Sequence, residues 1–289
     1  MKSMDDYGYY YANVSIDEPR INVLRRAVNS ALLLFFALVL TTLCYESIEA
    51  LACLALKYWV KFRFSEVRTV TEPGRWSLPR VIVVYSAGPL ICILLIMIGN
   101  SIYHTWEKMV NQYKLLFLWI VVASLNLITA NMIEAPIGLE STTFPFYRSF
   151  AILGAWFRLG SAPLLVVMFA GFILNVLGGY FFSYRFLEYS HSSKLIHHRS
   201  GKVYVFFQVF ILPIIVVAPL YLSLAGNFNI LHFATVLISL MTFSLGFFVR
   251  SITDMGIVVC NKNDVLNKVP VVTGIAAVVI WVAIFIFLK

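Results

Sequence analysis

The chain has 289 residues and a formal net charge of +8, and 61% of its residues are hydrophobic against 12% charged. A mean hydropathy of +0.86 excludes a soluble globule of ordinary composition. The positive charge is spread over several polar stretches without a block of Lys or Arg, so we assign it to lipid headgroups and expect no nucleic-acid partner. The sequence therefore predicts an integral, polytopic membrane protein in contact with the lipid bilayer.

Repeated apolar runs of about 20 residues, long enough to cross a hydrocarbon core of about 30 Å, predict α-helices and not barrel strands. A polar N-terminal segment, 1–26, precedes them, and we expect it to be retained because it lacks the pattern of a cleaved signal peptide. The expected spans cover about residues 27–59, 81–103, 115–133, 162–182, 203–225, 230–248 and 269–288. The predicted fold class is an all-α polytopic membrane protein with about seven transmembrane helices.

The connections between these spans carry weaker patterns. Residues 61–64 alternate polar with apolar side chains, residues 67–70 are β-rich, and Pro73-Gly74 is a turn signal, so we expect a short β-hairpin-like loop after the first span. Residues 138–158 are interpreted as an aromatic interfacial connection. Spans five and six are expected to form a tight hairpin around Gly226-Asn227.

Two carboxylates interrupt the C-terminal part of the first apolar run. Glu46 and Glu49 lie within the stretch 43–52, and a carboxylate inside a span costs roughly 2.5–3.5 kcal/mol on insertion scales. In a helix Tyr45 and Glu49 share a face at i,i+4, and Glu46 adjoins Glu49 at i,i+3. The stretch is therefore a candidate functional site.

Topology predicts which other polar residues lie near this stretch. Odd spans run from the side of the N-terminal segment, side A, to the opposite side, side B, and the second span runs back. Glu46 and Glu49 lie past the middle of the first span, Gly88-Pro89 lies near the start of the second, and Glu134 lies near the end of the third. All should therefore lie towards side B. The predicted site comprises Tyr45, Glu46, Glu49, Gly88, Pro89, Asn126, Asn131 and Glu134.

In the order and spacing of these motifs the sequence resembles the site-2 proteases, a family of intramembrane zinc metalloproteases. That family has HExxH on one helix, a Gly-Pro segment after a short β-rich loop, and a third helix with Asn, then Pro three on, then Asp-Gly eight on. Here Tyr45-Glu46-Ser47-Ile48-Glu49 stands at the first motif and Ala87-Gly88-Pro89-Leu90 at the second. In the third, Asn126 is followed three on by Thr129 and eight on by Glu134. The resemblance covers about residues 30–140.

The residue types depart from the family at the positions that hold zinc. The resemblance gives those positions to two His and one Asp, with the Glu between the His residues as the base. This chain has Tyr45, Glu49 and Glu134 there, and only Glu46 keeps its type. Zinc prefers imidazole or thiolate ligands, and a tyrosine is protonated at neutral pH. The resemblance therefore implies a degenerate three-helix core over 27–138, followed by an additional four-helix membrane region over 139–289, without family proteolysis.

Our first hypothesis is a catalytically inactive relative of these proteases that acts as an interaction or scaffold subunit of a larger membrane complex. Its partners would be other membrane protein subunits. The resemblance, with the lack of eukaryotic targeting signals, favours the bacterial inner membrane. We predict no catalytic residue, no bound metal and no cofactor.

Three alternatives remain for Glu46, Glu49 and Glu134. They can form a buried hydrogen-bonded network with one or more protonated carboxyls. They can form the proton- or cation-binding site of a transporter-type component, since hard oxygen ligands suit protons, Ca, Mg or Mn better than zinc. They can also hold a divalent metal for residual hydrolysis.

The remaining polar residues of interest have simpler interpretations. His104 and His232 are interpreted as interfacial or core hydrogen-bonding residues, and Asn175 as an interhelical hydrogen-bond donor. The loop residues His191, His197 and His198 are not assigned a site. The four Cys residues show no metal-ligand spacing, and we expect no disulfides.

Overall fold

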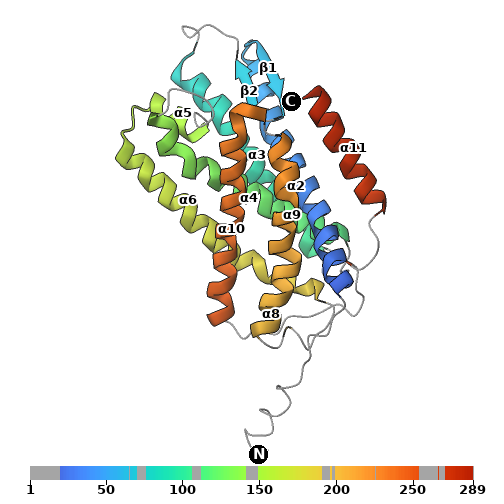
Figure 1. Cartoon of the computed structure of the whole chain (residues 1–289). Coiled ribbons are helices and arrows are strands. Elements are labelled where there is room, and N and C mark those ends of the chain that lie inside the picture. Colours follow the sequence, from blue (N-terminus) through green and yellow to red (C-terminus); the bar gives the residue numbers. More distant parts are fainter. Residues whose placement is uncertain are drawn as a thin grey trace, which may run out of the picture.

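The computed structural model describes residues 20–64, 66–69, 76–105, 112–140, 149–190, 196, 199–224, 226–253, 266 and 271–288. The described part is a bundle of long helices with a small two-stranded sheet at one end (Figure 1). Several residues interpreted from sequence lie outside it, namely Pro73, Gly74, His191, His197, His198 and Cys260.

Six helices of the described part are long and apolar enough to cross a membrane. Four of them are α2 (Arg20–Ala55), α3 (Leu78–Thr105), α4 (Gln112–Glu140) and α10 (Gly226–Thr253). A fifth is α6 (Ser161–Phe182), continued by the 3-10 segment η2 (Ser183–Tyr189). The sixth runs through α8 (Arg199–Phe206), the π-helical η3 (Phe207–Ile211) and α9 (Leu212–Leu224). The prediction of an all-α polytopic membrane protein is confirmed. A shorter apolar helix, α11 (Val271–Phe287), follows.

The helix α2 ends at Ala55, before Tyr58 and Trp59, which the predicted first span includes. Lys57 adopts a left-handed conformation, with φ of 61°, and the N–H of Tyr58 donates to Cys53 O at 2.9 Å. The N–H of Lys57 donates to Leu54 O at 2.9 Å, which completes a Schellman cap. The predicted range 27–59 was therefore wrong at both ends, because the helix begins at Arg20 and this cap closes it at Ala55.

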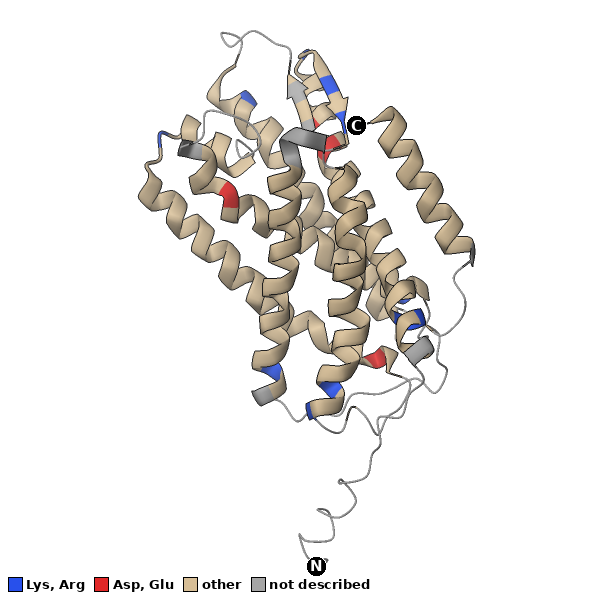
Figure 2. Ribbon diagram, viewed as in Figure 1, with Lys and Arg blue, Asp and Glu red and all other residues tan. Residues whose placement is uncertain are grey.

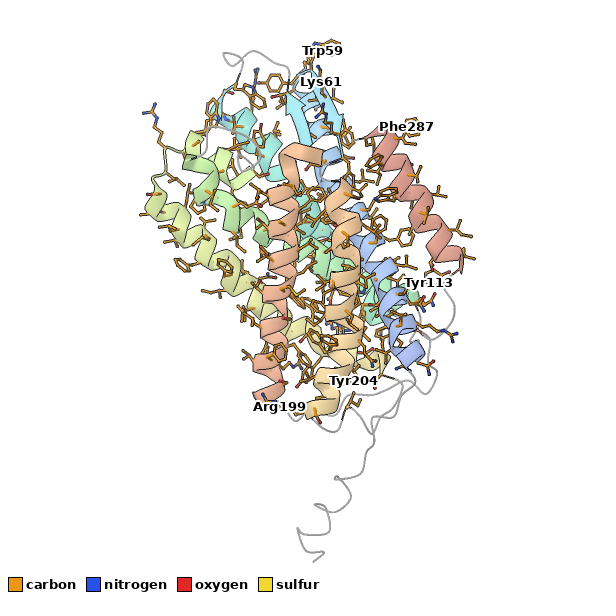
Figure 3. The ribbon with its side chains drawn as sticks, in the orientation of Figure 1. Trp59, Lys61, Tyr113, Arg199, Tyr204 and Phe287 are labelled. Carbon is orange, nitrogen blue, oxygen red and sulfur yellow. The ribbon has the colours of Figure 1, made fainter. Side chains whose placement is uncertain are left out.

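Beyond this cap lies the two-stranded sheet. Strands β1 (Val60–Arg63) and β2 (Glu66–Thr69) pair antiparallel, with Val60 opposite Thr69. The N–H of Phe64 donates to the carbonyl of Leu288 at 2.9 Å, so the sheet is joined to the end of α11. Side B is therefore the end of the bundle that carries the sheet, and Trp59 and Phe287 lie there (Figure 3).

The inner helices are α2 and α4. About two thirds of the most apolar window of each is buried, at 67%, whereas the corresponding windows of α3 and α6 are 22% and 28% buried. The helix α2 packs against α3, α4, α9 and α11, and α4 packs against α3, α6 and α10. Charged residues gather at the two ends of the bundle, and the middle is nearly free of them in the described part (Figure 2). The outer helices α3 and α6 therefore present mainly apolar surface.

Two connections differ from their predicted form. Within 138–158, α4 continues to Glu140 and a further helix, α5 (Ser149–Trp156), follows, with residues 141–148 outside the described part. The helix α5 is apolar and is stabilised by packing on α3 and α4. The aromatic residues on either side of it led us to interpret the whole stretch as an interfacial connection. The predicted hairpin centre Gly226-Asn227 instead begins α10, and α9 ends at Leu224.

Candidate functional site

The polar stretch of α2 is buried against α5. Tyr45, Glu46 and Glu49 are 1%, 2% and 7% exposed. The hydroxyls of Tyr45 and Ser149 hydrogen-bond at 2.5 Å, and Ser149 Oγ donates to Glu49 Oε1 at 2.9 Å. Because Ser149 has one hydroxyl proton and gives it to Glu49, the Tyr45 hydroxyl is the donor to Ser149. The first residue of α5 therefore bridges two α2 side chains that are four positions apart.

The Gly-Pro segment of α3 meets the same stretch. A Cβ placed on Gly88 would overlap the ring carbons of Tyr45, so the absence of a side chain at Gly88 is what lets α3 lie against this ring. Pro89 follows inside the same helix. The topology of the first two spans predicts that Gly88 and Tyr45 both lie towards side B, and the structure brings them into direct contact.

Glu134 of α4 joins a different helix. Its Oε2 lies 2.8 Å from Nδ1 of His232 on α10, and the two side chains are 1% and 2% exposed. The second carboxyl oxygen, Oε1, is buried and has no hydrogen-bond partner among the described residues. Glu134 therefore links α4 to α10, whereas Glu49 links α2 to α5.

The asparagines of α4 extend this contact along the helix. Asn126 Nδ2 donates to the carbonyl of Val236 on α10 at 2.7 Å, and Asn131 Nδ2 donates to Leu127 O within α4 at 2.8 Å. The Oδ1 atoms of both are buried and lack a partner in the described part. Thr129 Oγ1 lies 3.1 Å from Ser239 Oγ of α10. Polar contacts therefore follow the α4–α10 interface over several turns.

The helix α6 joins the same polar seam through Asn175. Its Nδ2 donates to the carbonyl and hydroxyl oxygens of Ser239, at 2.6 and 2.7 Å, and to Thr242 Oγ1 at 2.7 Å. The prediction of Asn175 as an interhelical donor is confirmed. Close backbone packing accompanies it, because a Cβ on Gly179 would overlap the carbonyl of Phe243 on α10.

Glu49 and Glu134 thus have different hydrogen-bond partners on different helices. The residues that the structure describes contain no group of three or more His, Cys, Asp or Glu side chains placed to hold a metal ion. Glu49 is hydrogen-bonded to a serine and Glu134 to a histidine, and Glu46 is buried on α2. Cys44, Cys53 and Cys92 are free thiols. The arrangement is suited to fixing helices against one another.

Sequence reasoning did not include two residues that complete these contacts. Ser149 lies in the stretch interpreted as an interfacial connection, and His232 was interpreted only as an interfacial or core hydrogen-bonding residue. A detectable pattern exists for His232, because it lies seven positions before Ser239 and so shares a helix face with it. Comparisons with protein-family models, with curated proteins and with solved structures found no match.

Proposed function

We propose that the chain is a catalytically inactive, site-2-protease-like membrane protein that acts as an interaction or scaffold subunit of a larger membrane complex. One observation supports this most directly: the side chains at the three family ligand positions make direct hydrogen bonds to neighbouring helices. Tyr45 and Glu49 meet through Ser149, and Glu134 meets His232. Side chains used in this way stabilise helix packing.

The local geometry gives hydrolysis less support. A catalytic zinc site keeps three protein ligands of suitable type and an open position for water. Here the Tyr45 ring lies directly on Gly88 and its hydroxyl is bonded to Ser149. A closed, hydrogen-bonded contact of this kind fits a structural role better than an open metal site.

The same proposal includes a seventh membrane segment formed by α11. Its 17 residues would extend about 25 Å as a helix, close to the thickness of a hydrocarbon core. Among the hydrogen bonds that attach it to the rest of the described part are one from Trp281 Nε1 to Ser223 Oγ at 2.9 Å and, just after its last residue, one from Phe64 N to Leu288 O at 2.9 Å. For the location we propose the bacterial inner membrane, on the strength of the family resemblance.

The test is recovery of a partner under mild conditions. The full chain, carrying an affinity tag and expressed at its natural level, is solubilised from its own membrane in a mild detergent and purified. We expect at least one other membrane protein in a stoichiometric ratio, absent from a parallel purification of an unrelated tagged membrane protein. If the chain is recovered alone, also after chemical cross-linking in the membrane, the scaffold proposal is wrong.

A Glu46→Gln variant separates a scaffold from an enzyme. Glu46 keeps the residue type of the family's base, so in a hydrolase this change slows turnover and increases the amount of bound substrate recovered. A scaffold recovers its partner in the same ratio with either residue. An increase in the recovered protein that occurs only with Glu46→Gln would contradict the proposal and indicate a substrate.

A further inference from the structure

Two buried acceptors on one face of α4 have no donor in the described part of the chain. Glu134 Oε1 is the first, and Asn131 Oδ1, three positions earlier, is the second. The other atoms of both groups are used, since Glu134 Oε2 contacts His232 Nδ1 and Asn131 Nδ2 donates to Leu127 O. Both side chains are 1% exposed, so bulk water does not satisfy these oxygens.

Buried acceptors without a donor destabilise the fold, and a single added proton could satisfy both of these oxygens. A buried polar atom without a partner loses the hydrogen bonds that it makes with water, and the cost is greater if it carries charge. Residues three apart on a helix are neighbours on its surface. A carboxylic acid has an O–H donor that a carboxylate lacks. A proton on Glu134 Oε1 therefore turns one orphaned acceptor into a donor for the other.

We propose that Glu134 is an intramembrane proton-binding site, with the proton held on Oε1 and donated to Asn131 Oδ1. In this state Oε2 accepts a hydrogen bond from the Nδ1–H of a neutral His232. The pair carries no net or separated charge, which removes the cost of placing ions in a low-dielectric interior. The alternative, a carboxylate beside an imidazolium, leaves both orphaned oxygens without a donor.

The groups around this site are consistent with a neutral pair. Among the described residues, His232 is the ion-pair partner of Glu134. The basic residue at the side-B end of α3 is Arg80, and its Nη1 donates to the Tyr58 hydroxyl at 3.2 Å. The other titratable groups near this end on elements packed against α4 are Cys44, Tyr45, Glu46, Glu49, Cys53, Tyr85 and Cys92. The described residues of α5 include no titratable group, and α6 has none at this end.

This inference does not depend on the scaffold proposal, because it assigns a ligand, a proton, to one residue. It concerns His232, which lies outside the stretch that resembles the proteases. A chain recovered without a partner would leave it unchanged.

The experiment is infrared spectroscopy of the full chain in lipid bilayers at neutral pH, in H2O and in D2O. The difference between the wild type and Glu134→Gln should contain the C=O stretch of a protonated carboxyl, with the downshift that D2O causes. Glu49→Gln is the matched control and should leave that band in place. A difference spectrum that contains only carboxylate bands would overturn the proposal.

A second measurement on the wild-type chain does not depend on a variant that folds. Nitrogen NMR of the protein labelled at histidine reports the protonation of each ring, and a His232→Gln sample assigns the signal. We expect a neutral imidazole with its proton on Nδ1. An imidazolium signal for His232 at neutral pH would overturn the proposal. Asn131→Leu should shift the Glu134 C=O band to higher frequency, and no shift would show that Asn131 is not the acceptor.

Discussion

The polar site at side B has two halves, one formed by Tyr45, Glu49 and Ser149 and the other by Glu134 and His232. The two halves differ in how far the hydrogen-bonding groups of their side chains are satisfied. Around Tyr45, hydrogen bonds run from the Tyr45 hydroxyl to the Ser149 hydroxyl and on to Glu49, and the aromatic ring fills the space left by Gly88. Around Glu134, Oε2 is hydrogen-bonded to His232, and Oε1 has no hydrogen-bond partner in the described part. The stability of the first half should therefore depend mainly on side-chain shape. The stability of the second half should depend mainly on whether its side chains supply enough hydrogen-bond donors.

Glu134→Ala should have the largest effect on the free energy of unfolding. It leaves Nδ1 of the buried His232 without its acceptor and opens a cavity between α4 and α10, for a loss of about 3 kcal/mol or more. Unfolding in mixed detergent micelles, followed by circular dichroism, measures it. Glu134→Gln is the control, because the amide keeps one acceptor and supplies a donor, and it should cost below about 1 kcal/mol. Equal losses in the two variants would contradict this account.

Gly88→Ala is the matching change in the first half and tests its sensitivity to shape. The added methyl group overlaps the Tyr45 ring, and separating α2 from α3 should cost about 1–3 kcal/mol. Gly274 of α11 is the control, since a Cβ there meets nothing within 4 Å and Gly274→Ala should be neutral or slightly stabilising. The same unfolding measurement compares them. A Gly88→Ala protein as stable as Gly274→Ala would mean that α3 does not lie on Tyr45.

Ser149→Ala tests whether the bridge between α2 and α5 is a real connection. The variant removes one partner from both the Tyr45 hydroxyl and the Glu49 carboxyl, so we expect a loss of about 1–3 kcal/mol. Ser161, exposed at the start of α6, provides a control in which the same substitution should change stability little. An unchanged stability would show that Ser149 does not bridge the two helices.

The contrast between the halves also explains what could be predicted from sequence. Apolar run length placed the membrane helices, and the alternation of their directions placed Gly88 at the same end of the bundle as Tyr45. The end of α2 was missed because Lys57 takes the left-handed position that glycine usually marks, while the apolar residues continue past it. Spacing along a chain predicts neighbours on one helix face and, with topology, the end of the bundle at which they lie.

The partners of the carboxyl groups could not be predicted in this way. His232 lies 98 positions from Glu134, and Ser149 lies 100 positions from Glu49. Each contact depends on how one helix is rotated against another, which the packing of the whole bundle sets. The glycines of the α6–α10 crossing, Gly179 and Gly246, help to set that rotation by letting the backbones touch. The polar residues were recognisable in the sequence, but the pairs they form were not.

Tyr45→Phe is the smallest change and separates the ring of Tyr45 from its hydroxyl. The ring stays on Gly88 and the bond to Ser149 is lost, which should cost about 0.5–1.5 kcal/mol. In the Ser149→Ala background the same change should cost almost nothing, because the bond is already absent, so the double-mutant cycle isolates it. If Tyr45→Phe cost as much in both backgrounds, the hydroxyl would have another partner, and Ser149 would not be the link between Tyr45 and Glu49. A coupling confined to this pair, with none between Tyr45→Phe and Glu134→Gln, would establish that the two halves are energetically independent despite lying at the same end of the bundle.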